Sequence, residues 1–591
     1  MTPSTARVVP DVPTFAVDRG FWYSIPDQLR HSISVGSIVR VPLSGRKTRG
    51  FVVEMGAEKE GKLKDIAALS SEAPVFDEGL LESLLWAANH YVAPLPVVLE
   101  RSLPPNLPSP PKERERSPVA VDPTGALARI AESVSRGVRR PTTAVVGRWQ
   151  SLDWLAAISP IPTVGRSALI VTATEAEATS VTMAARDLGF PVTEVAGEAG
   201  RALTDAWVEA QVPGRLVVGT PRVAGWQIPG LALAVVLEEG RRAMKDRQTP
   251  TVHVRDLMTT RSRVEGFTLV FLGPTPTLEV LAAGPDVVRM GNRAWGLVEV
   301  VDRSEDQPGS GFLAERTVAA IKAMVRSGRR VFVFTHRRSA DSSMRCVQCK
   351  RVRVCEACGS RLGREPACRR CGTPSGPCPR CGGTSFEEMG SEPQRIVAEI
   401  DRKVGAGVAV LDPSRGPVAV GTERDLASLQ PVPLVVAVDV DGLMLGHNYR
   451  TSEEALRILA RLAGAVEIGT GRRLMAQTSL PDSSLVAALR RGDPIPYLEG
   501  ILAERARHGF PPATELLAIE VRGTVDPIGI DRDLRELDGG AVILGPAEVE
   551  RGWRWLLQGS LGPVRLALRP LVQRWRDAGS TVRIDADPID L

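Results

Sequence analysis

Eight cysteines carry the clearest chemistry in this sequence, and all of them lie between Cys346 and Cys381. They form four C-x-x-C pairs: Cys346/Cys349, Cys355/Cys358, Cys368/Cys371 and Cys378/Cys381. Two thiolates at this spacing can bind one metal ion from the same turn, and Zn²⁺ prefers four such ligands in a tetrahedron. The sequence therefore predicts two structural zinc sites per chain, each with four cysteine ligands and closed because no position is left for water. A disulfide cluster is the alternative, but it requires an oxidising compartment, of which the sequence carries no sign.

The way in which the pairs share metal ions is less constrained, since four pairs can combine in three ways. Five residues separate the first two pairs and six separate the last two, which is short beside the usual spacers of about 12–20 residues. A nested arrangement relaxes this constraint. It places Cys346, Cys349, Cys378 and Cys381 in zinc site 1, and Cys355, Cys358, Cys368 and Cys371 in zinc site 2. So small a module buries little apolar surface, so zinc is expected to supply its folding free energy.

Length and composition indicate a globular protein of several domains. A chain of 591 residues is expected to form several domains, and its 43% hydrophobic and 24% charged residues are ordinary for globular proteins. A net charge of +5 is compatible with nucleic-acid binding but does not require it. The N-terminus lacks the apolar core of a signal peptide, and no run of eighteen apolar residues occurs. We expect a cytoplasmic, nucleoid-associated protein without a membrane part, in which thiols stay reduced.

The N-terminal part, residues 1–105, reads as a small β-rich domain followed by helical residues 74–93. Its aromatic run Phe21-Trp22-Tyr23 lies in a predicted strand, where alternation sends Trp22 to the face opposite its neighbours. An exposed ring near basic residues suits the stacking of DNA bases, although three core rings fit the pattern equally well. A Pro-rich, charged linker is predicted over 106–124.

Strands and helices alternate over residues 125–285 and again over 286–500, a rhythm that predicts two parallel sheets covered by helices. One of the strands is predicted at Leu434–Val440. The cysteine module, residues 341–390, interrupts the second sheet, so this lobe has a first part at 286–340 and a second at 391–500. Residues 501–591 predict a separate small α+β domain. Two consecutive lobes of this kind are typical of nucleotide-driven motors.

The chemistry of such a motor is missing. A phosphate-binding loop of the form G-x-x-x-x-G-K-[ST] does not occur in the sequence. After the first predicted strand of the first lobe, Thr142–Val146, the chain continues Gly147-Arg148-Trp149, without a glycine-rich turn or a Lys followed by a hydroxyl.

Several stretches resemble the primosomal protein N′ (PriA, replication restart) family over nearly the whole chain. They are FWYSIP and VGSIVRVPLSGRKTRGFVV, GRLVVGTPRVAGWQIPGLALAVVLEEG, THRRSADSSMRCVQC with the cysteine pairs, DVDG at 439–442, and STVRIDADPIDL. The resemblance implies an α/β multidomain protein with an OB-like 3′-DNA-end-binding domain, two RecA-like helicase lobes, a two-zinc insertion and a C-terminal domain. It also implies nested zinc pairs, and a DNA-binding pocket formed by Phe21, Trp22, Gly45 and Lys64. The family usually has Asp where Trp22 stands.

The same resemblance exposes departures in the ATP site. The family's DEEH box corresponds to Leu237-Glu238-Glu239-Gly240, a degenerate Walker B motif that keeps Glu238 and Glu239 but lacks the Mg²⁺-binding Asp. Ala465 and Ile468 stand in place of the two arginines that bind the γ-phosphate. Each such loss alone can lower the rate of phosphoryl transfer by orders of magnitude. The sequence therefore predicts no catalytic residues and no role for ATP as a cofactor.

These expectations combine into a DNA-binding replication restart (primosome assembly) protein without ATPase activity. It would recognise arrested or branched forks through the 3′ end of the nascent strand and through single-stranded DNA. Its expected partners are primosome proteins, single-stranded DNA-binding protein, and the replicative helicase with its loader. Two alternatives remain: an active ATP-dependent 3′-5′ helicase with an atypical ATP site, and a zinc scaffold that binds only proteins.

Overall fold

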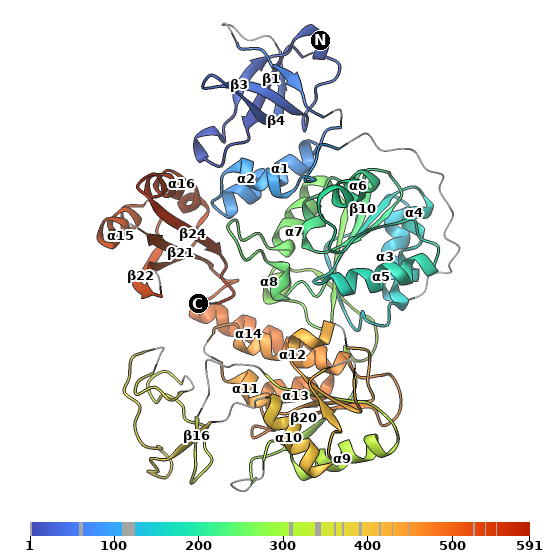
Figure 1. The fold of residues 1–591 in the computed structure, drawn as a ribbon, viewed down its shortest axis with the longest axis vertical. Coiled ribbons are helices and arrows are strands. Elements are labelled where there is room, and N and C mark those ends of the chain that lie inside the picture. Colours follow the sequence, from blue (N-terminus) through green and yellow to red (C-terminus); the bar gives the residue numbers. More distant parts are fainter. Residues whose placement is uncertain are drawn as a thin grey trace. The chain divides into compact units, whose positions relative to one another are not determined.

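The fold is that of a computed structural model. It describes residues 3–57, 63–71, 73–108, 125–306, 311–336, 344–359, 362–368, 371–388, 393–412, 415–427, 429–446, 448–523, 526–537, 539–550 and 552–590. The chain divides into two compact units (Figure 1). Unit 1 comprises Met1–Val145, Ser151–Val288 and Arg505–Ile589, and unit 2 comprises Val146–Gln150, Arg289–Glu504 and Asp590–Leu591. Most of the predicted linker, residues 109–124, lies outside the described residues.

Unit 1 begins with an antiparallel sheet in the order β2-β1-β4-β3-β5. Its strands are β1 (Thr5–Pro10), β2 (Phe21–Ser24), β3 (Ile38–Leu43), β4 (Arg46–Gly56) and β5 (Ala68–Leu69). The sheet curls until Asp65, just before β5, bridges to Ser24 at the end of β2. Inward-facing Val8, Tyr23 and Val39 are buried in the small core that this closure creates. The predicted β-rich N-terminal domain is confirmed.

Two helices follow this barrel, α1 (Glu78–His90) and α2 (Leu95–Arg101). The side chain of Asp77 accepts from Leu80 N and caps α1, and its apolar residues Leu80, Leu84 and Ala87 are buried. Helix α1 packs on α7 (Val254–Glu265) of the first parallel sheet's layer, as Figure 1 shows. The barrel is thereby joined to the next layer of unit 1 through a shared apolar core.

The first lobe holds a seven-stranded sheet in the order β12-β6-β11-β10-β7-β9-β8. The strands are β6 (Thr143–Val146), β7 (Ser167–Val171), β8 (Val192–Val195), β9 (Leu216–Gly219), β10 (Leu231–Leu237), β11 (Thr268–Gly273) and β12 (Asp286–Arg289). Besides α7, its helices are α3 (Ala126–Ser135), α4 (Pro160–Thr163), α5 (Glu175–Asp187), α6 (Gly200–Ala210) and α8 (Leu278–Ala282). Strands β7, β10 and β11 are buried almost completely, as expected for parallel strands covered on both faces.

Unit 2 is built on a six-stranded, wholly parallel sheet in the order β13-β20-β19-β14-β18-β17. The strands are β13 (Val298–Asp302), β14 (Val331–Phe334), β17 (Ala409–Val410), β18 (Val418–Gly421), β19 (Leu434–Ala437) and β20 (Arg473–Thr478). Its helices are α9 (Glu315–Arg326), α10 (Pro393–Lys403), α11 (Val440–Met444), α12 (Thr451–Gly464), α13 (Ser484–Arg491) and the greater part of α14 (Ile495–His508).

The strand predicted at Leu434–Val440 is wrong at its C-terminal end. Strand β19 stops at Ala437, and the Asp439 side chain accepts from Gly442 N to cap α11. The Asp439 carboxylate accepts one of the N–H groups that the first turn of a helix leaves without a backbone partner. This favours a helix, rather than a continued strand, after Asp439. Asp441 accepts from Thr478 Oγ1 and from Ser479 N, so the DVDG block serves the structure of the sheet's edge.

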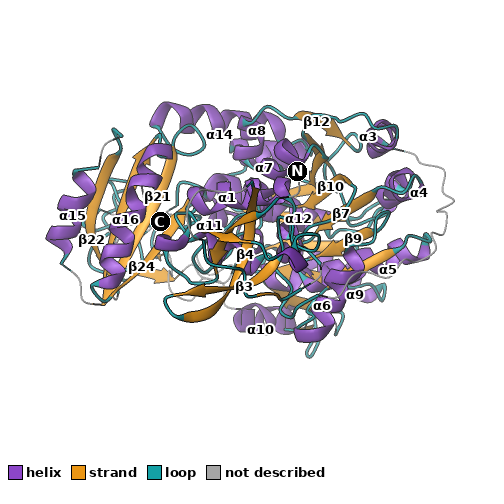
Figure 2. Cartoon of the chain, turned by 90° about the horizontal axis from the view of Figure 1, so that it is seen from above, coloured by secondary structure: helices purple, strands orange, loops and turns teal. Residues whose placement is uncertain are grey.

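The C-terminal domain belongs to unit 1 and has an antiparallel sheet in the order β22-β23-β21-β24. Its strands are β21 (Glu515–Gly523), β22 (Val542–Val549), β23 (Gly552–Gly559) and β24 (Ser580–Ala586), with helices α15 (Pro527–Arg535) and α16 (Gly562–Asp577) (Figure 2). The indole N–H of buried Trp555 donates to Asp531, and that of buried Trp575 donates to Asp533. Both buried N–H groups therefore have a hydrogen-bond partner. The α/β multidomain fold class is confirmed. None of the helices in the described part of the chain has the length and apolar character of a membrane span.

Candidate functional site

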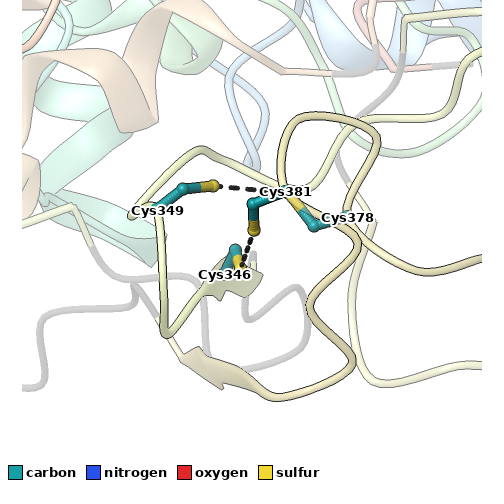
Figure 3. Close-up of side chains that lie close together, drawn as sticks. All are labelled: Cys346, Cys349, Cys378 and Cys381. Atoms are coloured by element: carbon teal, nitrogen blue, oxygen red, sulfur yellow. Dashed lines mark hydrogen bonds between the residues drawn. The ribbon is translucent and has the colours of Figure 1, made fainter.

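The cysteine module presents the most complete site. Cys346 Sγ lies 3.5 Å from Cys381 Sγ, and Cys349 Sγ lies 3.4 Å from Cys378 Sγ (Figure 3). All four sulfur atoms lie within 4.8 Å of one another. In a tetrahedral site with Zn–S bonds of about 2.3 Å the sulfur atoms are about 3.8 Å apart. These distances fit a shared metal ion and exceed the roughly 2.05 Å of a disulfide.

The inner pairs form a second cluster of the same kind. Cys355 Sγ lies 3.5 Å from Cys371 Sγ, Cys358 Sγ lies 3.6 Å from Cys368 Sγ, and the four sulfur atoms again lie within 4.8 Å. The structure thus groups the cysteines in the nested sets.

The residue that follows each cysteine pair is a sequence feature that the analysis of cysteine spacing missed. After the second cysteine of each pair stands a residue with positive φ: Lys350, Gly359, Gly372 or Gly382. Its N–H donates to the carbonyl of the first cysteine of the pair at 2.8–2.9 Å. Glycine adopts this conformation without steric cost, so glycine directly after three of the four pairs is part of the motif.

The base of the module is a two-stranded ribbon of β15 (Met344–Cys346) and β16 (Phe386–Glu388). Glu387 accepts from Arg345 Nε and Lys350 Nζ, each at 2.6 Å, and the Arg353 guanidinium lies 4.1 Å from the centroid of the Phe386 ring. Between this ribbon and the parallel sheet of unit 2 lies a hollow of about 1000 Å³. Its basic lining residues are Arg303, Arg345, Lys350, Arg351, Arg364, Arg380 and Arg395.

The predicted DNA-end residues gather around β2. Phe21 is 43% exposed, whereas Tyr23 is buried and donates from its hydroxyl to Pro42 O at 3.4 Å, close to the turn that holds Gly45. Gly45 has a φ of +80° and no atom near a potential Cβ. Ser24 N donates to Lys64 O at 3.0 Å, and the Lys64 side chain is exposed. A side-chain bond from Tyr23 and a backbone bond from Ser24 thus link β2 to Pro42 and to Lys64.

The Trp22 ring packs against the end of β4 in the barrel. It is partly buried and lies over Gly56, where a Cβ would come within 2.7 Å of the ring. Trp22 therefore packs against β4 with one part and leaves another part accessible. Its role in base stacking stays a prediction.

The position of the missing phosphate loop is filled by protein. Residues Val146–Gln150 belong to unit 2, where the Arg148 guanidinium donates to Gly464 O at 2.7 Å and to Val466 O. Gly147 packs against the Met290 side chain, and Trp149 is buried. The chain continues as a short 3-10 helix, Asp153–Ile158, with the acidic Asp153 in its first turn. A phosphate site needs free N–H groups at a helix N-terminus, and a carboxylate there repels phosphate.

The degenerate Walker B residues serve the interior of the first lobe. Leu237 is buried at the end of β10. Glu238 has a φ of +48° and lies 3.6 Å from the Arg241 guanidinium. Glu239 Oε1 accepts from Thr277 N at 2.8 Å, and burial raises the pKa of its carboxyl. The Glu239 carboxylate thus ties the turn after β10 to the start of α8.

In unit 2, the positions that correspond to the γ-phosphate arginines offer no cation. Ala465 N donates to Arg461 O within the last turn after α12, and Ile468 is 73% exposed. The nearby Arg461 is buried and donates to Glu423 at 2.7 Å. A guanidinium already paired in this way is not available to a nucleotide.

Comparison with known proteins finds relatives among replication restart proteins. Residues 7–104 match the family described as the 3′ DNA-binding domain (3′BD) of PriA. Replication restart protein PriA of Thermotoga maritima is 26% identical over 380 residues, which cover 58% of this chain and 51% of that protein. Probable replication restart protein PriA of Deinococcus radiodurans is 28% identical over 63% of this chain and 46% of its own. The chain thus spans about half the length of these two relatives.

Replication restart protein PriA of Rickettsia conorii aligns along 89% of both chains at 21% identity. Among solved structures, RecG bound to a three-way DNA junction is 11% identical with a TM-score of 0.38, covering 77% of this chain and 56% of RecG. The match over residues 7–104 and the relatives named replication restart protein PriA agree with one another. The chain is similar to the replication restart protein PriA family along most of its length.

Proposed function

We propose that this protein recognises arrested or branched replication forks and helps to load the replicative helicase. The observation that carries the proposal is the match of residues 7–104 to a domain described as binding 3′ DNA ends. The exposed Phe21 and Lys64 and the open turn at Gly45 supply an aromatic ring, a cation and close backbone access. These are the groups expected to hold the terminal nucleotide of a strand.

The metal bound by the two cysteine clusters is proposed to be Zn²⁺, one ion per cluster. Four thiolates and no oxygen or nitrogen ligand suit zinc in a structural site, and each ion would fix the ends of two turns. In the hollow beneath the module, Arg345 and Lys350 are paired with Glu387 and Arg303 with Asp306. A role of this hollow in DNA binding therefore rests on its other arginines, Arg351, Arg380 and Arg395, which would contact phosphates. The residues of the end pocket and the domain boundaries predicted from the sequence remain part of the proposal.

The protein is proposed to act without hydrolysing ATP. Arg148 occupies the segment where a phosphate loop would lie, and its donors are used by the carbonyls of Gly464 and Val466. Leu237 offers no oxygen to magnesium, so neither the phosphates nor the metal would be held for transfer. Primosome proteins, single-stranded DNA-binding protein, and the replicative helicase with its loader are the proposed partners, in the cytoplasm.

Binding to defined DNA forks tests this function. We expect tight binding to a fork with a free 3′-OH at its branch, and weaker binding when a 3′-phosphate crowds the end pocket or when the DNA is a blunt duplex. The affinity should fall steeply with salt, because phosphate contacts release counterions. Equal affinity for all three DNAs would overturn end recognition, and DNA-stimulated ATP hydrolysis would favour the helicase alternative.

A further inference from the structure

A cavity of about 480 Å³ in unit 1 lies where α1 and α2 pack against the first parallel sheet. Its floor is aliphatic and includes Leu84 of α1, Val98 of α2 and Leu257 of α7. The volume falls in the range of cavities that bind small organic groups, roughly 300–1,000 Å³. This cavity is separate from the barrel's end pocket and from the cysteine clusters.

The cavity is placed where parallel sheets bind ligands. One wall is the 3-10 turn Pro221–Gly225, which follows β9, and another is the loop after β10 that leads to α7. Loops at the carboxyl ends of parallel strands form the ligand crevices of open α/β sheets. The remaining wall comes from α1 and α2, so the site depends on the N-terminal part of the chain as well as on the lobe.

The loop after β10 is held in shape by Arg101 at the end of α2. Its guanidinium donates to Asp246 at 3.0 Å and to the carbonyls of Thr249 and Pro250. On the opposite wall, a Cβ on Gly225 would lie 2.8 Å from Ser102 Oγ, so α2 and the 3-10 turn approach closely. The cavity is therefore a built feature, closed on two sides by specific contacts.

Two further cations stand at its rim. Arg222 and Arg247 line the cavity, and both are exposed. Within the described part of the chain, neither guanidinium forms a hydrogen bond or an ion pair, although Arg222 lies close enough to Asp246 to favour its charged form. Arg101 bonds Asp246 directly. An aliphatic floor beneath two available guanidinium groups complements a ligand with a flat apolar body and a phosphate.

We propose that this cavity binds one unpaired nucleotide, with its base on the aliphatic floor and its phosphate at Arg222 and Arg247. The nucleotide can come from a free mononucleotide or from the unpaired strand of a fork, and both share this chemistry. The site rests on the DNA-binding role proposed above and adds to it a second contact, which reads an unpaired base away from the 3′ end.

Charge reversal at the rim provides the first test. The variant Arg222→Glu/Arg247→Glu is compared with Arg201→Glu/Arg263→Glu, which changes the charge equally at two exposed positions of unit 1 outside the cavity. The rim variant should weaken binding of an unpaired oligonucleotide about tenfold. It should also reduce the slope of log affinity against log salt by roughly 1.4, since each phosphate contact on a single strand contributes about 0.7. Equal effects of the two variants would overturn the site.

Photo-crosslinking of the unmodified protein gives a test that does not depend on variant folding. A 4-thiothymidine placed in the unpaired arm of a fork should crosslink to peptides that contain residues 98–102, 221–225 or 246–257. Crosslinks confined to other peptides would overturn the proposal. Competition by thymidine monophosphate would show that a free nucleotide suffices, and competition by unlabelled oligonucleotide alone would assign the site to the strand.

The remaining outcomes separate this inference from the function on which it rests. A fork with double-stranded arms and a free 3′-OH at its branch should bind the rim variant as it binds the unmodified protein, because the barrel holds the end. Loss of all DNA binding by the unmodified protein would refute the proposed function itself. An acidic peptide that binds at the rim, where no oligonucleotide does, would refute the nucleotide site alone.

Discussion

Replacing one outer cysteine should remove one zinc ion and leave the other in place. In Cys346→Ser the hydroxyl is a poor ligand, and Cys349, Cys378 and Cys381 alone do not close a tetrahedron. The inner cluster uses none of these residues. We therefore expect the zinc content to fall from two ions per chain to one.

Losing one zinc ion should unfold part of the cysteine module, because few other interactions stabilise it. Leu362 is the main buried aliphatic side chain beside the inner cysteines, worth about 1.5–3 kcal/mol. The ion pairs of Glu387 are partly exposed and contribute about 0–1 kcal/mol each. A structural zinc ion contributes about 10–16 kcal/mol at neutral pH. The outer turns should therefore lose their fixed conformation without their metal, whereas the inner turns keep theirs.

Zinc analysis together with differential alkylation measures both effects. In Cys346→Ser, the outer cysteines should react with iodoacetamide in the native protein, and the inner four should stay protected until a chelator is added. The matched variant Cys355→Ser should show the reciprocal pattern, with the outer four protected. Selective exposure of Cys355 and Cys358 in Cys346→Ser would refute the nested pairing, and so would loss of both ions from either variant if the rest of the chain stays folded.

Three further outcomes are expected. Leu237→Asp should not create ATP hydrolysis in a coupled assay, because Arg148 still fills the phosphate position; measurable turnover would show that the missing Asp was the decisive loss. Trp22→Ala should weaken binding to a fork with a free 3′-OH by about 1–3 kcal/mol if a base stacks on the ring, whereas Trp22→Phe should retain most of the affinity. Burial raises the pKa of Asp587 to about 6, so the folded chain holds this proton more tightly than the unfolded chain. The free energy of unfolding should therefore fall by roughly 3 kcal/mol as the pH rises from about 4 to above 6, a loss that Asp587→Asn should abolish in urea titrations.

Cysteine spacing predicted the two cysteine clusters, and apolar runs predicted the central strands of the parallel sheets. The central strands of both parallel sheets are uninterrupted apolar runs that end close to where the sequence indicated, because burial on both faces leaves no room for polar residues. Strand β22 escaped prediction because it lies at the edge of its sheet. Its side chains are mostly exposed, and Gly545-Pro546 interrupts the pattern at a bulge.

Arg148 shows the limit of reasoning from residue types. The sequence identified Gly147-Arg148-Trp149 as unfit for phosphate, but it gave no hint that Arg148 has a structural task. Its acceptors are backbone carbonyls at Gly464 and Val466, more than 300 positions further along the chain. Backbone acceptors leave no trace in residue identity, so only the fold could reveal them.

The attachment of the C-terminal domain within unit 1 extends this argument. Lys245, in the loop after β10, is buried and donates to Asp585 Oδ1 at 2.6 Å and to the carbonyls of Ala586 and Asp587 at 2.7 and 2.9 Å. A buried ammonium without such partners would be strongly destabilising, so this loop and β24 are tied to one arrangement. The loop that follows β10 therefore has a structural role of its own, because it anchors the C-terminal domain.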